Sequence, residues 1–198
     1  MRHPSLCPQD VIVLLRVRQC VHTRWTYSEI AEEIGLSASQ VHASVRRAVG
    51  AGLMATQRPR EQDGTPYAGR EVRVEAFTEF LIHGARYAFP PQTLTAAMGW
   101  PTAYSHPTLS QALRSASGDS AGRWVWPSPD GPVFGTGLMP LHPCALGIAA
   151  GETAALKALY TQLAMFDELR VGGSRGRKFA GEYLRAAVAR PGELVEVR

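Results

Sequence analysis

The chain has 198 residues, of which 45% are hydrophobic and 19% are charged, and its formal net charge is +4. This composition excludes a disordered polymer and is typical of a folded chain, in one ordinary domain or two small ones. No stretch reaches the roughly 18 apolar residues that span a membrane, and no secretion signal is evident. The three cysteines are scattered and odd in number, which argues against a disulfide framework. We therefore expect a cytoplasmic protein with no membrane partner.

The first predicted element is a helix over residues 8–20, PQDVIVLLRVRQC. Val11, Leu14 and Leu15 give it an apolar body. The β-branched run over residues 11–13 would also suit a strand. The position of this element directly before residues 26–53, described next, favours the helix.

Residues 26–53, TYSEIAEEIGLSASQVHASVRRAVGAGL, predict two short helices joined by a tight turn. Each helix starts with a capping box, in which an N-terminal hydroxyl and a side chain three residues later satisfy each other's backbone. A glycine that tolerates a left-handed conformation separates them. The signals are Thr26 with Glu29, Gly35, and Ser37 with Gln40. We interpret this pattern as a helix-turn-helix.

Apolar residues at helical spacing give each of these helices a buried face. A small residue, Ala31, stands where the two helices approach each other. The predicted buried residues are Ile30, Ala31 and Ile34 in the first helix, then Val41, Val45 and either Ala48 or Val49 in the second, with Leu53 beyond.

The opposite face of the second helix is polar and basic, and it contains no acidic residue. A helix fits the DNA major groove, where glutamine pairs with adenine and arginine pairs with guanine or phosphate. The first helix carries three glutamates, so we do not expect it to lie on phosphate. The alternative is a solvated helix face in a protein–protein module. The predicted DNA contacts are Ser37, Ser39, Gln40, His42, Ala43, Arg46 and Arg47.

The pattern I-A-x-x-x-G-L-S-x-x-x-V followed by a leucine resembles the winged-helix branch of bacterial helix-turn-helix regulators, which includes MarR-like repressors. The matching residues are Ile30, Ala31, Gly35, Leu36, Ser37, Val41 and Leu53. The resemblance is confined to residues 1–88. It implies that the second helix enters the major groove, with Ser39, Gln40, Ala43, Arg46 and Arg47 as the readers.

A β-hairpin is predicted next, with strands at Met54–Arg58 and Glu71–Val74 around a Gly/Pro-rich loop. Such a wing can contact the DNA backbone or a minor groove. The alternative is a solvated loop, since Glu61 and Asp63 dilute its positive charge. The basic residues of the wing are Arg58, Arg60, Arg70 and Arg73.

A connecting helix is predicted over Glu75–Tyr87, followed by Pro90 and Pro91. Its expected buried residues are Phe77, Phe80, Leu81 and Tyr87. We interpret His83, which lies within this apolar helix, as a core histidine.

The rest of the chain predicts strands at Arg123–Trp126 and Val133–Leu138, joined as a hairpin by PSPDG, and helices at Glu152–Leu169 and Gly176–Ala189. The fold class predicted is therefore mainly α with a small β component. A winged helix-turn-helix with its connecting helix would occupy residues 1–88. An α+β part ending in two helices would occupy residues 89–198, and the resemblance assigns dimerisation and regulation to it.

Two weaker patterns do not change this prediction. The basic, glycine-rich segment Arg170–Lys178 can cradle phosphate but lacks the Walker spacing, so an interhelical turn is favoured. His106, His142 and Cys144 do not complete a zinc ligand set. No catalytic motif occurs, and we expect no enzyme activity, no metal and no cofactor.

The sequence thus favours a transcriptional regulator that binds double-stranded DNA sequence-specifically, as a repressor acting on a palindromic operator in the form of a homodimer. The alternative is an antitoxin-like or adaptor protein whose C-terminal half grips a partner protein through the apolar face of Glu152–Phe166. A third hypothesis is a small-molecule sensor with a pocket lined by Trp100, Trp124 or Trp126.

Overall fold

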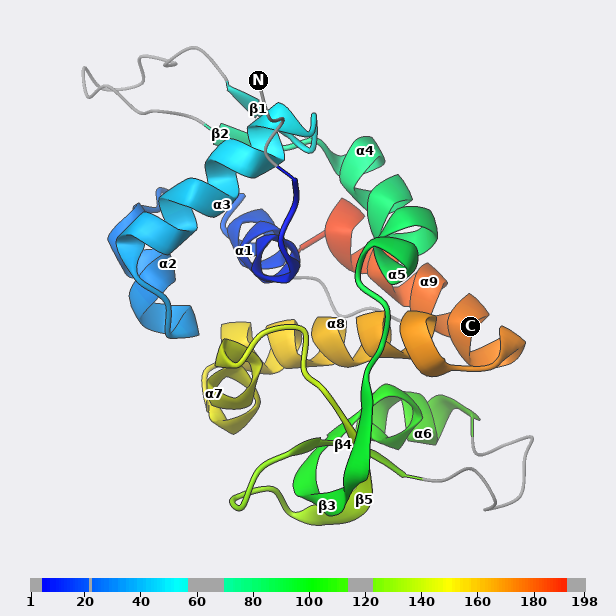
Figure 1. Cartoon of the computed structure of the whole chain (residues 1–198). Coiled ribbons are helices and arrows are strands. Elements are labelled where there is room, and N and C mark those ends of the chain that lie inside the picture. The colour runs from blue at the N-terminus through cyan, green and yellow to red at the C-terminus, as the bar shows by residue number, and fades with distance from the viewer. Residues whose placement is uncertain (1–4, 22, 57–69, 114–122, 192–198) are drawn as a thin grey trace.

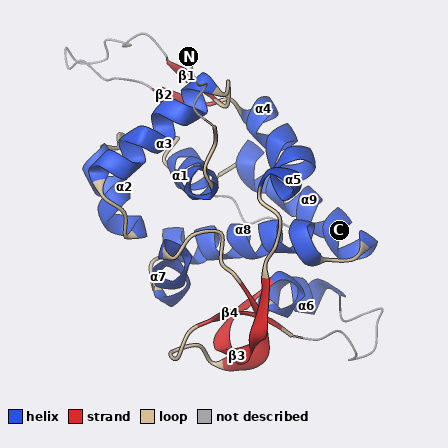
Figure 2. Ribbon diagram, viewed as in Figure 1, coloured by secondary structure: helices blue, strands red, loops and turns tan. Residues whose placement is uncertain are grey.

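The computed structural model describes residues 5–21, 23–56, 70–113 and 123–191. Helices dominate it, and the β structure is confined to one short strand pair and one small barrel (Figure 2). The predicted class, mainly α with a small β component, is therefore confirmed. Within these residues, no helix combines the length and apolarity that crossing a membrane requires.

The N-terminal part contains α1 (Pro8–Gln19), α2 (Tyr27–Ile34) and α3 (Ala38–Gly50). Both predicted capping boxes form, because each pairs groups only three residues apart. Thr26 Oγ1 accepts from the Glu29 N–H at 3.2 Å, and Ser37 Oγ accepts from the Gln40 N–H at 3.2 Å. Gly35 ends α2 in the left-handed region at φ +69°. The predicted helix-turn connection is confirmed in its local detail.

The strand pair consists of β1 (Met54–Thr56) and β2 (Arg70–Val72), which run antiparallel with Met54 opposite Val72. These strands lie within the predicted hairpin, and β2 ends before the predicted Val74, which already belongs to the next helix. Two predicted wing arginines, Arg58 and Arg60, lie outside the described residues.

The predicted connecting helix forms as α4 (Val74–Glu79), a π-helical turn η1 (Phe80–Gly84) and α5 (Ala85–Ala88). A π turn inserts one extra residue, so the positions after it rotate relative to a regular α-helix. Phe77 and Leu81 are buried as predicted. The burial predicted for Tyr87 and His83 is wrong, because Tyr87 is 71% exposed and His83 also faces solvent.

A closed barrel of three strands follows, formed by β3 (Thr93–Thr102), β4 (Trp124–Pro127) and β5 (Val133–Leu138). β3 pairs antiparallel with β5 along its first part and with β4 along its second part. β4 and β5 are parallel to each other, so the hairpin predicted for them is wrong.

The reason is that the β4–β5 connection crosses β3 instead of turning back beside it. Gly99 of β3 is opposite both Pro127 and Val133, at the crossing point. Gly131 lies against it so closely that a Cβ at Gly131 would stand 2.0 Å from the Gly99 carbonyl carbon. A turn-forming sequence alone does not reveal which side of a third strand the chain takes.

The remaining helices are η2 (Ala103–Ser105), α6 (Pro107–Leu113), α7 (Cys144–Ala150), α8 (Ala154–Val171) and α9 (Ser174–Ala189). α8 and α9 confirm the two predicted C-terminal helices with small shifts in their bounds. α8 crosses the middle of the molecule, between helices α1–α3 and the barrel (Figure 1).

The apolar residues of α8 form the centre of the core. Leu159, Leu163 and Phe166 are at most 1% exposed, and they belong to one cluster that includes the apolar residues of α1. The apolar face of Glu152–Phe166 that suggested a partner protein is thus covered by the chain itself. The predicted N-terminal and C-terminal parts share this continuous core.

Candidate nucleic-acid interface

α3 has one face in the core and one face in solvent. Val41, Val45 and Ala48 are fully buried against α1 and α2, while Val49 is only partly buried. The side chains of Ser37, Ser39, Gln40, His42 and Arg46 lie on the exposed side, and Ala43 is half-buried at its margin. The sequence therefore placed most of the predicted outer face correctly.

Gln40 is exposed, yet its side chain also makes a hydrogen bond that stabilises the start of α3. Its Oε1 accepts a hydrogen bond from the Ser37 N–H at 2.8 Å, which completes the cap of α3. The Nε2 group remains able to donate. A bidentate pair with adenine uses both ends of the amide, and Oε1 has a second lone pair with which to accept from the base while it keeps the cap.

Two other exposed side chains are oriented by neighbours. The hydroxyls of Ser37 and Ser39 lie 3.0 Å apart. The His42 ring stands edge-on to the Tyr27 ring of α2, with 5.2 Å between centroids. The first turns of α3 thus present polar groups held in place by α2 and by the cap.

The expected phosphate contact of Arg47 is not supported by its geometry, and its assignment to the outer face is wrong. Its guanidinium donates two hydrogen bonds to the Asp10 carboxylate of α1, from Nε at 2.8 Å and from Nη2 at 2.6 Å. Asp10 is 1% exposed, and a buried carboxylate needs a partner of opposite charge. This hydrogen bonding to Asp10 raises the pKa of Arg47. Arg47 therefore fastens α3 to α1.

The acidic residues of α2 are partly neutralised within the chain. Glu29 Oε2 accepts from the Thr26 N–H at 2.7 Å, at the positive end of the α2 dipole. Glu33 Oε2 accepts from Arg16 Nε of α1 at 2.6 Å. Only Glu32 of the three is exposed without a role in these contacts. The negative charge next to the outer face of α3 is thus smaller than the sequence suggests.

Of the predicted wing residues that are described, Arg70 is half-buried at the start of β2 and Arg73 is exposed after its end. The strand pair lies next to the C-terminal end of α3 (Figure 1). The exposed side chains here include Arg73 and also Glu71, which lies between the two wing arginines in the chain.

The other polar candidates have structural explanations. Burial lowers the pKa of His106 to about 4, and its ring packs edge-on against Tyr160. Burial raises the pKa of the Cys144 thiol to about 12, so that thiol stays protonated at neutral pH. No group of three or more potential metal-ligating side chains exists within the described part of the chain.

Arg170 at the start of the basic segment and Trp126 also belong to the core, whereas Arg175 and Lys178 are exposed. Arg170 donates to Asp167 at 2.7 Å and to the carbonyl of Phe89 at 3.0 Å, so it does not face a phosphate. Trp126 is 1% exposed and donates from Nε1 to Asp167 at 2.6 Å. Trp100 and Trp124 are half-buried around it. Trp126, which was predicted to line a ligand pocket, is therefore packed in the core.

Comparison of the chain with protein-family models, curated proteins and solved structures finds no significant match.

Proposed function

We propose that this protein is a transcriptional regulator that binds double-stranded DNA sequence-specifically, with α2 and α3 as a helix-turn-helix and the strand pair as its wing. The observation that carries the proposal is the outer face of α3. It is polar and basic, has no acidic residue, and belongs to a helix capped at its start and fixed from behind by the Asp10–Arg47 pair. A rigid helix with such a face suits the major groove.

The residues assigned to DNA contact are Ser37, Ser39, Gln40, His42, Ala43 and Arg46, with Arg70 in the wing. Arg47 is withdrawn from the predicted set because Asp10 holds it. Arg58 and Arg60 remain in the proposal from the sequence alone. One recognition helix makes few contacts, so we further propose a homodimer that represses by occupying a palindromic operator.

The decisive experiment is a selection of bound duplexes from a random DNA pool, with the full chain as bait. We expect an enriched motif with two-fold symmetry. The same selection with Arg46→Gln should recover less DNA of every sequence, and Gln40→Ala should relax preference at one base position. Enrichment of no motif by the wild-type chain would contradict the proposal.

A second candidate is the antitoxin-like or adaptor protein, in which the C-terminal half binds a partner protein. The apolar face that first suggested it is buried, but Met98 and Phe134 are directly opposite each other on β3 and β5 and are 43% and 61% exposed. Exposed apolar pairs of this kind mark interaction surfaces when they are contiguous. Co-purification from the native host with wild type and with Phe134→Ser would separate this candidate, since a partner bound at the barrel should be lost only from the variant.

A further inference from the structure

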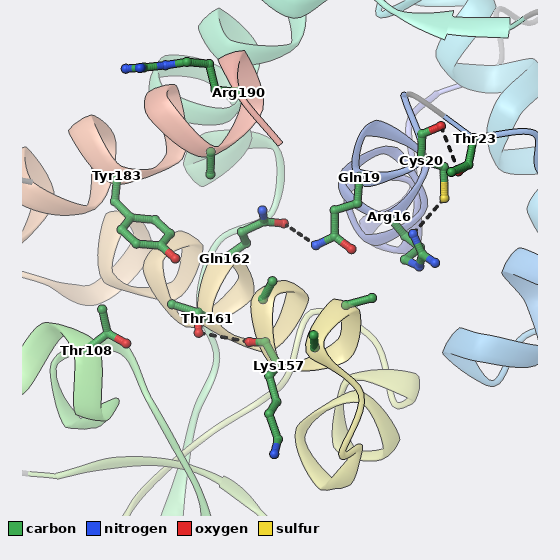
Figure 3. Close-up of a pocket in the computed structure, with 14 residues that line it drawn as sticks. Arg16, Gln19, Cys20, Thr23, Thr108, Lys157, Thr161, Gln162, Tyr183 and Arg190 are labelled. Atoms are coloured by element: carbon green, nitrogen blue, oxygen red, sulfur yellow. Dashed lines mark hydrogen bonds between the residues drawn. The ribbon is translucent and has the colours of Figure 1, made fainter. Parts of the chain in front are cut away.

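A cavity of about 770 Å³ lies between the N-terminal and C-terminal parts of the chain. Its walls come from the end of α1, from α8 and α9, and from the start of α6 (Figure 3). This volume falls in the range of pockets that hold small molecules, about 300–1,000 Å³. The cavity contains none of the residues assigned to DNA contact.

The walls are mostly apolar and made of small residues. Ala154, Ala155 and Ala158 of α8 and Ala187 of α9 line the cavity, and the Tyr183 ring forms one side. Short side chains leave room between the helices, whereas larger ones would fill it. The lining therefore suits a flat or extended apolar body.

The charged residues that line the cavity are Arg16, Lys157 and Arg190, with no aspartate or glutamate among the described lining residues. Arg16 is held by Glu33 at 2.6 Å, so the charge argument depends on Lys157. Lys157 is paired with Glu152 at 2.8 Å, but both side chains are largely exposed, so that pair is weak. An anionic group on a ligand would meet favourable charge here.

The polar groups between α1 and α8 are incompletely paired. Gln19 Nε2 donates to Gln162 Oε1 at 3.3 Å, and the two side chains face each other across the cavity wall (Figure 3). Gln162 is 6% exposed. Gln19 Oε1 is buried and has no hydrogen-bond partner within the described residues. An unpaired buried acceptor is unfavourable, and a ligand N–H or O–H would pair with it.

We propose that this cavity binds a small amphipathic anion, a molecule with an apolar body, an acidic group and a hydrogen-bond donor. The apolar body lies on the alanines and Tyr183. The acidic group meets Lys157 at the rim. The donor reaches Gln19.

Hydrogen bonds from α1 connect the cavity wall to α2 and α3. The inference drawn from this connection rests on the proposed function. Arg16 of the cavity wall is bound to Glu33 of α2, and Asp10 on the same helix α1 is bound to Arg47 of α3. A ligand that moves the end of α1 relative to α8 therefore moves the helices that present the DNA face. We expect bound ligand to change the affinity for DNA.

The test uses 1-anilinonaphthalene-8-sulfonate, a fluorescent aromatic anion whose anilino N–H supplies the donor, with decanoate as a competitor that has only the apolar chain and the carboxylate. We expect saturable fluorescence with one site per chain, displaced by decanoate and much less by decylammonium, which has the same chain and the opposite charge. Equal displacement by the two, or no saturable fluorescence, would overturn the proposal.

Two variants locate the site. Ala158→Trp places a large ring at an exposed position of the cavity wall and should weaken decanoate binding about tenfold or more, a loss of roughly 1.4 kcal/mol. Ala88→Trp is the matched control, since this exposed alanine of α5 lies outside the cavity, and it should bind as wild type. Equal binding by Ala158→Trp and wild type would place the ligand elsewhere and refute the site.

The coupling is measured by fluorescence anisotropy of a labelled duplex with and without decanoate. A shift in DNA affinity that Ala158→Trp abolishes supports it, and unchanged affinity at saturating decanoate refutes it. If the chain binds no duplex, the proposed function and the coupling fail together, while displacement and the two variants still decide the ligand site.

Discussion

The two neighbouring arginines of α3, Arg46 and Arg47, should have completely different effects on stability when each is replaced. Arg47→Met removes the partner of a carboxylate that is 1% exposed, while Arg46→Met changes a side chain in solvent. Removing one member of a buried ion pair costs about 3–5 kcal/mol. The Arg47 side chain is itself 18% exposed, and Asp10 keeps one hydrogen bond, from the Cys7 N–H, so we expect the lower end, about 3 kcal/mol.

The assay is urea unfolding followed by tryptophan fluorescence, completed as a double-mutant cycle with Asp10→Ala. Contacting groups of this kind couple by about 0.5–3 kcal/mol, and we expect a value near the top of that range. Arg46→Met should stay within about 0.5 kcal/mol of wild type.

DNA binding gives the complementary readout. Under the proposed function, Arg46→Met should reduce the salt dependence of binding by about one phosphate contact, and Arg47→Met should leave that slope unchanged in folded protein. A stability loss from Arg47→Met no larger than that from Arg46→Met, or a coupling under about 0.5 kcal/mol, would refute the role assigned to the Asp10 pair.

Three further predictions concern stability and use the same unfolding assay. Asp167→Ala should cost about 3–5 kcal/mol, because Arg170, Thr102 and Trp126 all donate to this buried carboxylate, and a loss below about 1 kcal/mol would argue against that network. Burial raises the pKa of Glu168 from 4.5 to about 7, so its contribution to stability falls as the pH rises across this window, while buried His106, whose pKa is lowered from 6.5 to about 4, contributes the opposite change. Glu168→Gln should therefore make stability rise more steeply with pH than in the wild type, and an unchanged profile would exclude a contribution from Glu168. Gly35→Ala should cost about 1 kcal/mol through backbone conformation alone, since a Cβ there meets nothing within 4 Å, and a neutral result would mean that the turn relaxes.

Sequence reasoning succeeded where the determining contacts are local. The caps of α2 and α3 depend on pairs three residues apart, such as Ser37 with Gln40, and the left-handed Gly35 depends on its own backbone. The helical spacing of apolar residues also predicted α8, although it did not predict which helices would cover its apolar face. These features placed most of the outer face of α3 correctly.

The failures concern contacts between distant segments. Arg47 was assigned outward because its partner lies in α1, and the available signal was an aspartate, Asp10, inside an otherwise apolar helix. β3 was missed because TLTAAMGWPT contains alanine, glycine and proline, and it forms a strand through partners on both of its edges. The cavity between α1 and α8 had no signature at all, since its alanines look like ordinary helix residues.

The crossing of Gly99 and Gly131 also restricts how this part of the sequence can vary. A Cβ at Gly131 would stand 2.0 Å from the Gly99 carbonyl carbon, and a Cβ at Gly99 would stand 2.2 Å from the Trp126 carbonyl oxygen, so a side chain at either position displaces backbone. Neither glycine can therefore be exchanged during evolution without rebuilding the barrel. We expect distantly related chains that share this barrel to keep both glycines even where the rest of their sequences differ. The two glycines would then help to recognise such chains.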